Sequence, residues 1–280
     1  MQKLKIKVTE EWAGNKAFRA FLEALPRTFN EKGEVIHSGR NVLRVVEAEN
    51  LGLEGIDRVV VKRFHGLFWV QSILYSFFFK PKGRKAYDNT TELERRGFEP
   101  AHELALVEVW QHGLYRYSFF VTEMVMGERL TKLIRGLQAS HQQEAVRQVV
   151  KQYATMVKNL HERGVLYQDL NGGNVICRQD ETSGLWHFAL VDTNRARLYD
   201  DGTTLELKSA KKDLILMNPE LGTNKMFQEE YLRQRGLYTP ETAAYLLKAQ
   251  YGRYARKRCW YRKLLKKYRV FYHWLTRSEM

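Results

Sequence analysis

Residues 160–174 read LHERGVLYQDLNGGN, and this stretch decides how the rest of the chain is interpreted. Within it, Asp169 and Asn174 lie five positions apart on a loop between a helix-like segment and an apolar pair. A second apolar run, residues 188–191, ends directly on Asp192. A loop with a carboxylate and an amide, followed by a strand that ends on another carboxylate, supplies the oxygen ligands that Mg²⁺ prefers. The spacing therefore predicts one site built from this loop and this strand end.

Phosphoryl transfer is the chemistry that uses these groups in this order. Asp169 is predicted to be the catalytic residue that receives or orients the substrate hydroxyl. Asn174 and Asp192 are predicted to hold Mg²⁺ against nucleotide phosphates, so the expected cofactors are ATP and Mg²⁺. An ordinary turn or strand-end role explains any one of these residues alone, but it does not explain the set.

Lys62 lies near the end of an apolar run and is expected to contact the nucleotide phosphates as a point charge. A carboxylate from the following helix should orient this lysine. Asp88, Glu92 and Glu94 are the candidates, and because Asp88 and Glu92 lie four positions apart they share one face of that helix. Asp88 has the shorter reach and is slightly favoured, and either residue fits.

Two further segments are predicted to contact the nucleotide. Gly39, Arg40 and Asn41 form a tight turn whose backbone N–H groups would cover the phosphates, although a simple hairpin explains the same residues. Glu123 and Val125 are expected, from their position alone, to present backbone groups to the adenine edge.

The pattern of the whole chain predicts an α+β fold with two lobes. Strand-like segments dominate residues 1–126, which we expect to form a β-rich N-lobe that covers the nucleotide. Helical segments dominate residues 127–280, which we expect to form a C-lobe with the catalytic loop, the metal site and a basic helical tail. The two lobes would make one domain. Before the first strands, the sequence predicts one short helix that ends at Pro26.

Charge and composition narrow the class of partner. The chain has 280 residues with 46 Lys and Arg against 32 Asp and Glu, a net charge of +14, which favours an anionic partner. A membrane surface, a phosphorylated glycolipid and nucleic acid all fit, but no nucleic-acid-binding motif accompanies the charge. Two cysteines cannot build a disulfide framework or a Cys-rich zinc site, which is typical of a reducing cytoplasm. We expect no signal peptide and no membrane-spanning helix.

Residues 67–79 form an apolar and aromatic segment, and the basic residues 80–85 follow it. The segment is too short to span a bilayer. Aromatic residues beside Lys and Arg suit the interface of an anionic membrane, whereas the alternative is that the segment packs in the core. Residues 251–280 add a second basic and aromatic segment.

Together these residues resemble the lipopolysaccharide core kinases, the Kdo/heptose kinase group of Gram-negative bacteria, which have a protein-kinase-like fold. The resemblance covers roughly residues 39–192 and rests mainly on YQDLNGGN at 167–174 and on DTNRAR at 192–197. It implies ATP-dependent phosphorylation of a sugar hydroxyl on the lipid A-linked inner core, with Kdo favoured as acceptor and heptose second. It also implies a cytoplasmic protein, peripheral on the inner face of the inner membrane. Such kinases usually carry a Glu near Asp88, so the partner of Lys62 departs from their pattern.

Two other functions remain open at this point. One is a kinase for a soluble small molecule or a protein, and the other is a pseudokinase that binds nucleotide without turnover. The intact set of Lys62, Asp169, Asn174 and Asp192 argues against the pseudokinase. The pair at residues 167–168 is Tyr-Gln rather than the His-Arg of many protein kinases, so no receiver for an activation-loop phosphate is expected.

Overall fold

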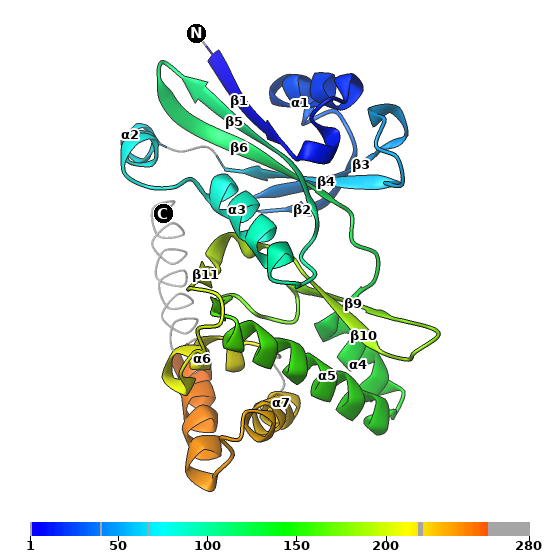
Figure 1. Cartoon of the computed structure of the whole chain (residues 1–280), viewed down its shortest axis with the longest axis vertical. Coiled ribbons are helices and arrows are strands. Elements are labelled where there is room, and N and C mark those ends of the chain that lie inside the picture. Colours follow the sequence, from blue (N-terminus) through cyan, green and yellow to red (C-terminus); the bar gives the residue numbers. More distant parts are fainter. Residues whose placement is uncertain (1, 40, 66–67, 218–220, 257–280) are drawn as a thin grey trace, which may run out of the picture.

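The computed structural model describes residues 2–39, 41–65, 68–217 and 221–256. One lobe is a six-stranded antiparallel sheet in the order β1-β5-β6-β4-β3-β2 (Figure 1). Its strands are β1 (Gln2–Val8), β2 (Glu34–Ser38), β3 (Val42–Glu47), β4 (Arg58–Phe64), β5 (Glu103–Gln111) and β6 (Leu114–Glu123). Two short 3₁₀ turns, η1 (Glu10–Trp12) and η2 (Glu49–Leu51), lie in its connections. This arrangement confirms the predicted β-rich half.

The N-terminal segment differs from the prediction in two ways. It contributes the edge strand β1, which pairs with β5, and helix α1 (Lys16–Thr28) continues through Pro26 instead of ending there. A proline inside a helix removes one backbone hydrogen bond. The apolar face of α1 outweighs that loss, because Phe18 and Leu22 are fully buried against the sheet.

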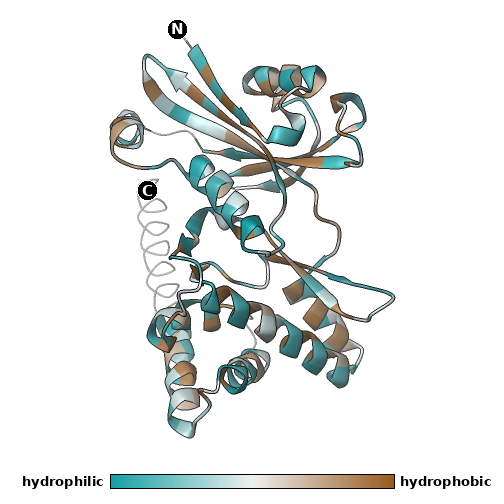
Figure 2. Ribbon diagram, viewed as in Figure 1, coloured by the Kyte–Doolittle hydropathy of each residue, from teal (hydrophilic) through white to brown (hydrophobic). Residues whose placement is uncertain are grey.

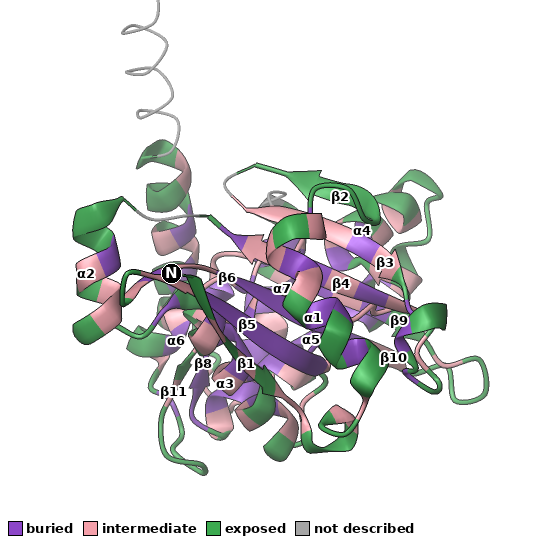
Figure 3. Ribbon diagram, turned by 90° about the horizontal axis from the view of Figure 1, so that it is seen from above, coloured by how far each residue is buried: buried purple, intermediate pink, exposed green. Residues whose placement is uncertain are grey.

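Two helices follow β4 and differ in their placement. Helix α3 (Lys82–Arg95) lies between the sheet and the second lobe, whereas α2 (Trp69–Phe77) projects at one edge of the sheet (Figures 1 and 3). The alternative that residues 67–79 pack in the core is wrong for the described part of that segment, since most of its large apolar side chains are exposed.

The second lobe is mainly helical. Its helices are α4 (Leu130–Ala139), α5 (Gln143–Glu162), α6 (Leu207–Leu214) and α7 (Leu221–Gln234), followed by helical residues 240–256. Small sheets join β7 (Glu128–Arg129), β9 (Val175–Gln179) and β10 (Trp186–Leu190), and β8 (Val165–Leu166) with β11 (Arg197–Leu198). The 3₁₀ turn η3 (Thr193–Arg195) follows β10.

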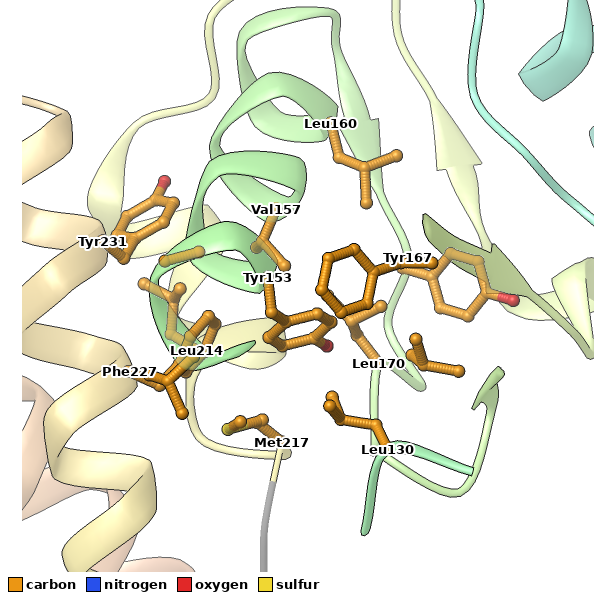
Figure 4. Packing of buried hydrophobic residues seen from close by; sticks show 14 of the residues in the cluster. Leu130, Tyr153, Val157, Leu160, Tyr167, Leu170, Leu214, Met217, Phe227 and Tyr231 are labelled. Atoms are coloured by element: carbon orange, nitrogen blue, oxygen red, sulfur yellow. The ribbon is translucent and has the colours of Figure 1, made fainter. Parts of the chain in front are cut away.

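The core of this lobe surrounds α5 (Figure 4). Tyr153 on α5 is fully buried and packs against Phe188 and Phe227, with ring centroids 5.5 and 5.1 Å away. Burial of such large side chains is the main stabilising contribution. Most of the predicted basic tail, residues 257–280, lies outside the described residues. Among the described helices, none is both long and apolar enough to cross a membrane.

The backbone connects the two lobes at two places in the described part of the chain. The chain passes between them after β6, where Gly127 has φ +140° and a Cβ atom would lie 2.5 Å from the Cys177 carbonyl oxygen. Only glycine fits this close approach. The backbone after α3 makes the second connection, because the N–H of Ala101 donates to Leu190 and the N–H of Leu190 donates to Glu99.

Candidate active site

A cavity of about 330 Å³ lies between the lobes. The sheet lines one side with Val60, Lys62 and Thr122, and the helical lobe lines the other with residues that include Asn174 and Asp192. Apolar walls with a few convergent polar groups are typical of nucleotide and small-molecule sites. The cavity therefore brings together three of the four residues predicted for catalysis, phosphate binding and metal binding.

The lysine of this cavity pairs directly with the strand-end carboxylate. Lys62 is only 9 % exposed, and its Nζ lies 2.5 Å from Oδ1 of Asp192. Asn194 also donates to that oxygen through its Nδ2. Asp192 has φ +67°, a left-handed conformation that turns its carboxylate out of the strand direction.

The structure does not pair either predicted helix carboxylate with Lys62. Asp88 bonds instead to Lys80 and lies 3.5 Å from Lys7. Glu92 accepts hydrogen bonds from Arg95 and Arg96. The hydrogen bond from Arg95 contributes most to lowering the pKa of Glu92 to about 2. The reason is helical geometry: the cleft-facing residues of α3 are at positions 86 and 90, about 200° around the helix from 88 and 92.

The catalytic loop is held by hydrogen bonds to its own backbone. Nδ2 of Asn174 donates to the backbone oxygen of Asp169 at 2.9 Å, and Nδ2 of Asn171 lies 3.2 Å from the Asp169 carboxylate. Arg195 Nη1 lies 3.1 Å from the other carboxylate oxygen. With its amide nitrogen engaged, Asn174 has its side-chain oxygen left to act as a ligand. Together with the Asp192 carboxylate it forms a set of hard oxygen donors that fits Mg²⁺.

Asp213 of α6 holds the backbone next to Asp169, a contact that the sequence reasoning missed. Its fully buried carboxylate accepts the backbone N–H groups of Tyr167 and Gln168 at 2.8 and 2.7 Å, and it lies 3.3 Å from Nε2 of His161. Gln168 has φ +66°, a strained conformation for a non-glycine residue. The carboxylate therefore fixes the backbone just before Asp169. No local pattern in the sequence points to this role, because the contacts join Asp213 to residues 45 and 46 positions away.

Tyr167 connects this loop to the strand end that carries Asp192. Its hydroxyl donates to the Val191 carbonyl at 2.6 Å, and its ring lies in the core. Burial raises the pKa of Tyr167 well above its usual value, so the hydroxyl stays protonated and remains a donor. The tyrosine therefore joins the loop that carries Asp169 to the strand end that carries Asp192.

Helix α3 is fixed to η3 by buried polar contacts. Thr193 donates through Oγ1 to the Ala86 carbonyl at 3.0 Å and lies 2.9 Å from Oγ1 of Thr90. Asn89 donates to the carbonyl oxygens of Thr193 and Ala196 at 2.8 and 3.1 Å. The segment directly after Asp192 is therefore held by a helix, as expected for a permanently assembled site.

The remaining predicted nucleotide contacts surround the same cavity. Asn41 lines it, and Gly39 lies in the turn between β2 and β3, while Arg40 lies outside the described residues. Glu123 and Val125 also line the cavity. The N–H of Glu123 already donates to His102, whereas within the described part of the chain the Val125 N–H has no partner. Val125 is thus the better donor to an adenine edge.

A second cavity of about 710 Å³ lies beside the first and shares Asn41 and Asp192 with it. Asp169 lines this second cavity. Its basic residues are Lys80, Lys82, Lys85, Arg195 and Arg197. Among the described residues that line this cavity, the acidic ones are Asp169 and Asp192, and Asp88 outside the lining pairs with Lys80. The cavity therefore suits an anionic molecule placed next to Asp169.

Comparison with known proteins agrees with this geometry. Residues 29–238, more than half of the chain, match the model of the lipopolysaccharide kinase (Kdo/WaaP) family. Among solved structures, that of WaaP in complex with acyl carrier protein is similar, with a TM-score of 0.59 and 19 % sequence identity over 90 % of this chain and 98 % of that one. This similarity confirms the kinase-like fold. No curated protein sequence matches the chain.

Proposed function

This chain belongs to the lipopolysaccharide kinase (Kdo/WaaP) family, whose members are phosphotransferases with hydroxyl acceptors, and from that premise we propose its substrate and its mechanism. The protein transfers the γ-phosphoryl group of ATP to a sugar hydroxyl of the lipid A-linked inner core, with Kdo favoured as acceptor and heptose second. It acts as a peripheral protein on the cytoplasmic face of the inner membrane. The observation that carries this proposal is the basic cavity beside Asp169, next to the cavity of Lys62 and Asp192.

The nucleotide occupies the first cavity. Val125 donates its N–H to the adenine edge, and Lys62 neutralises phosphate charge. Asn174 and Asp192 would hold a magnesium ion, which when bound would neutralise charge on the phosphates. Lys62 and Asp192 pair directly in the structure, so the lysine proposed to bind phosphate and the carboxylate proposed to bind the metal lie side by side.

The acceptor occupies the second cavity. Asp169 accepts a hydrogen bond from the acceptor hydroxyl and takes its proton as the new O–P bond forms. The bond between the γ-phosphorus and the bridging oxygen breaks, and ADP leaves with that oxygen. Arg195 holds the Asp169 carboxylate in place. Arg197 and the lysines attract the carboxylates and phosphates of the inner core.

A transfer assay tests the proposal. The purified protein is incubated with Mg²⁺, ATP and Kdo-lipid A, and mass spectrometry measures the gain of one phosphate. Wild type should add the phosphate, whereas Asp169→Ala should lose at least ~10²-fold in rate and still bind ATP. If wild type binds ATP but leaves Kdo-lipid A unchanged, the Kdo assignment fails. Heptose-bearing cores and soluble acceptors would then be tested in turn, and transfer to none of them would leave a pseudokinase.

A further inference from the structure

The one fully buried residue of helix α2 is a serine, whereas most of its large apolar residues are exposed. The residues directed at the sheet include Ser72, which is fully buried, and Ser76, which is partly buried. These two serines lie four positions apart and therefore share one side of the helix. A helix that belonged to the core would present the opposite arrangement, with its apolar stripe inward.

Hydrogen bonds hold α2 on the sheet from this polar side. The backbone N–H of Tyr115 on β6 donates to Oγ of Ser76 at 2.8 Å, and that hydroxyl donates to the Ser72 carbonyl at 2.6 Å. Arg116 donates to Oγ of Ser72 at 3.4 Å. The orientation of α2 is thus fixed by specific contacts, so its outward apolar face is a built feature and not a loosely packed one.

The outward face is large and aromatic. Phe68, Trp69, Phe77 and Phe78 are 81, 69, 70 and 74 % exposed, and Phe79 is 58 % exposed. Figure 2 shows apolar colouring on α2, and Figure 3 shows α2 exposed at one edge of the molecule. Scattered exposed apolar residues are common, but five exposed aromatic residues within positions 68–79 indicate an interaction site. We call these five residues the aromatic face.

The chain that follows the aromatic face leads into the acceptor cavity. Tyr75, on α2 itself, lines that cavity, and so do Lys80 and Lys82 directly after the helix. Lys85 completes the cluster and is exposed. An apolar, aromatic surface bordered by lysines matches the two layers of an anionic bilayer, hydrocarbon below and anionic headgroups above.

We propose that the aromatic face inserts into the interface of an anionic bilayer and so holds the mouth of the acceptor cavity at the level of the lipid headgroups. The acceptor sugar of a glycolipid would then reach Asp169 while its acyl chains stay in the membrane. The identity of that acceptor rests on the proposed function, but the docking does not. The adjoining lysines favour anionic lipid over a protein surface as the partner of the aromatic face. Binding to a protein surface is therefore treated as an alternative outcome of the test.

Binding to vesicles without any glycolipid tests the docking alone. Wild type should cosediment with phosphatidylglycerol vesicles and bind phosphatidylcholine vesicles more weakly. Brominated acyl chains should quench its tryptophan fluorescence, and Trp69→Phe should remove most of that quenching while leaving binding intact. The variant Trp69→Ser/Phe77→Ser/Phe78→Ser should bind at least ~10-fold more weakly. The matched control is Leu185→Ser/Tyr238→Ser, which removes exposed apolar residues elsewhere and should bind as wild type does.

Two measurements keep docking and catalysis apart. Thermal melting establishes that the triple variant is folded. Phosphate transfer is then measured with the core sugar carrying no acyl chains, for which the triple variant should keep the wild-type rate, and with glycolipid in vesicles, for which its KM should rise at an unchanged kcat. If the folded triple variant binds vesicles as well as wild type does, the docking proposal is overturned. It is also overturned if wild type binds no vesicles but forms an oligomer that the triple variant does not form. Absent phosphate transfer with intact, α2-dependent vesicle binding overturns the proposed function and leaves the docking standing.

Discussion

Helices α2 and α3 are neighbours in the chain but bury opposite kinds of residue. α3 places Ala86 and Leu93 inside and uses Thr90 to reach η3. α2 places serines inside and leaves its aromatic residues outside. α3 therefore packs in the interior of this protein, whereas α2 presents an apolar surface that the described residues do not cover.

The two regions also differ in how they are held. Behind the reacting groups, the region of α3, η3, the catalytic loop and Asp213 is a continuous set of buried hydrogen bonds. Such a set specifies one geometry, because each unmade bond is costly in a dry environment. α2 is attached by a few bonds at the edge of the sheet. Substitutions in the first region should therefore change stability and turnover, and substitutions on the aromatic face should change neither the stability nor the turnover of a soluble acceptor.

The largest effect is expected at Asp213. Asp213→Ala leaves the N–H groups of Tyr167 and Gln168 without their acceptor, so the free energy of unfolding should fall by about 3–5 kcal/mol. Urea unfolding measures this loss. Turnover should fall as well, because the backbone before Asp169 is no longer fixed. A variant as stable as wild type would show that this network does not hold the loop.

Thr193→Val removes the hydroxyl that joins η3 to α3 while it keeps the shape of the side chain. We expect the free energy of unfolding to fall by about 1–3 kcal/mol, since Thr90 and the Ala86 carbonyl lose a buried partner. The rate of phosphate transfer should fall with soluble and membrane-bound acceptors alike. An effect restricted to the membrane-bound acceptor would contradict the comparison of the two helices.

Glu92 makes the stability of the protein depend on pH. Its pKa is lowered from 4.5 to about 2, chiefly by Arg95, so its stabilising contribution is present above about pH 4.5 and is lost as the pH falls towards 2. Glu92→Gln should lower stability by roughly 1–2 kcal/mol at pH 7. Unfolding measured between pH 7 and pH 3 should show the two proteins converging at the acid end. Parallel curves would mean that the carboxylate contributes nothing.

The smallest change in stability is expected on the aromatic face. Phe77→Ser/Phe78→Ser should alter the free energy of unfolding by less than about 0.5 kcal/mol, because both side chains are largely exposed. Denaturant unfolding checks this. A loss of several kcal/mol, as core phenylalanines show on truncation, would instead mean that these rings pack in the interior.

The sequence predicted the parts of the molecule whose signal is local. The pattern of strands and helices correctly predicted the α+β fold with two lobes. The spacing of Asp169 and Asn174 and the apolar runs before Lys62 and Asp192 predicted four site residues, all of which line the two cavities. The role of Asp213 depends on a contact 45 residues away from Gln168. No local pattern reports such a contact.

The wrong predictions concern positions where tertiary packing overrides the local pattern. Asp88 and Glu92 were expected to face Lys62, but the rotation of α3 about its axis is set by packing on the sheet and on η3. Pro26 was expected to end α1, but tertiary packing overrode the local signal. The aromatic segment was left between core and membrane because its composition is the same in both cases, and only its exposure separates them.

Phosphate transfer by three proteins to two acceptors tests the central claim most directly. Wild type, Thr193→Val and Trp69→Ser/Phe77→Ser/Phe78→Ser are compared on the glycolipid in anionic vesicles and on the same sugar without acyl chains. The account predicts that Thr193→Val is slowed with both acceptors and that the α2 variant is impaired with the vesicle acceptor alone. Equal impairment of the α2 variant with both acceptors, or wild-type activity of it with both, would contradict the account.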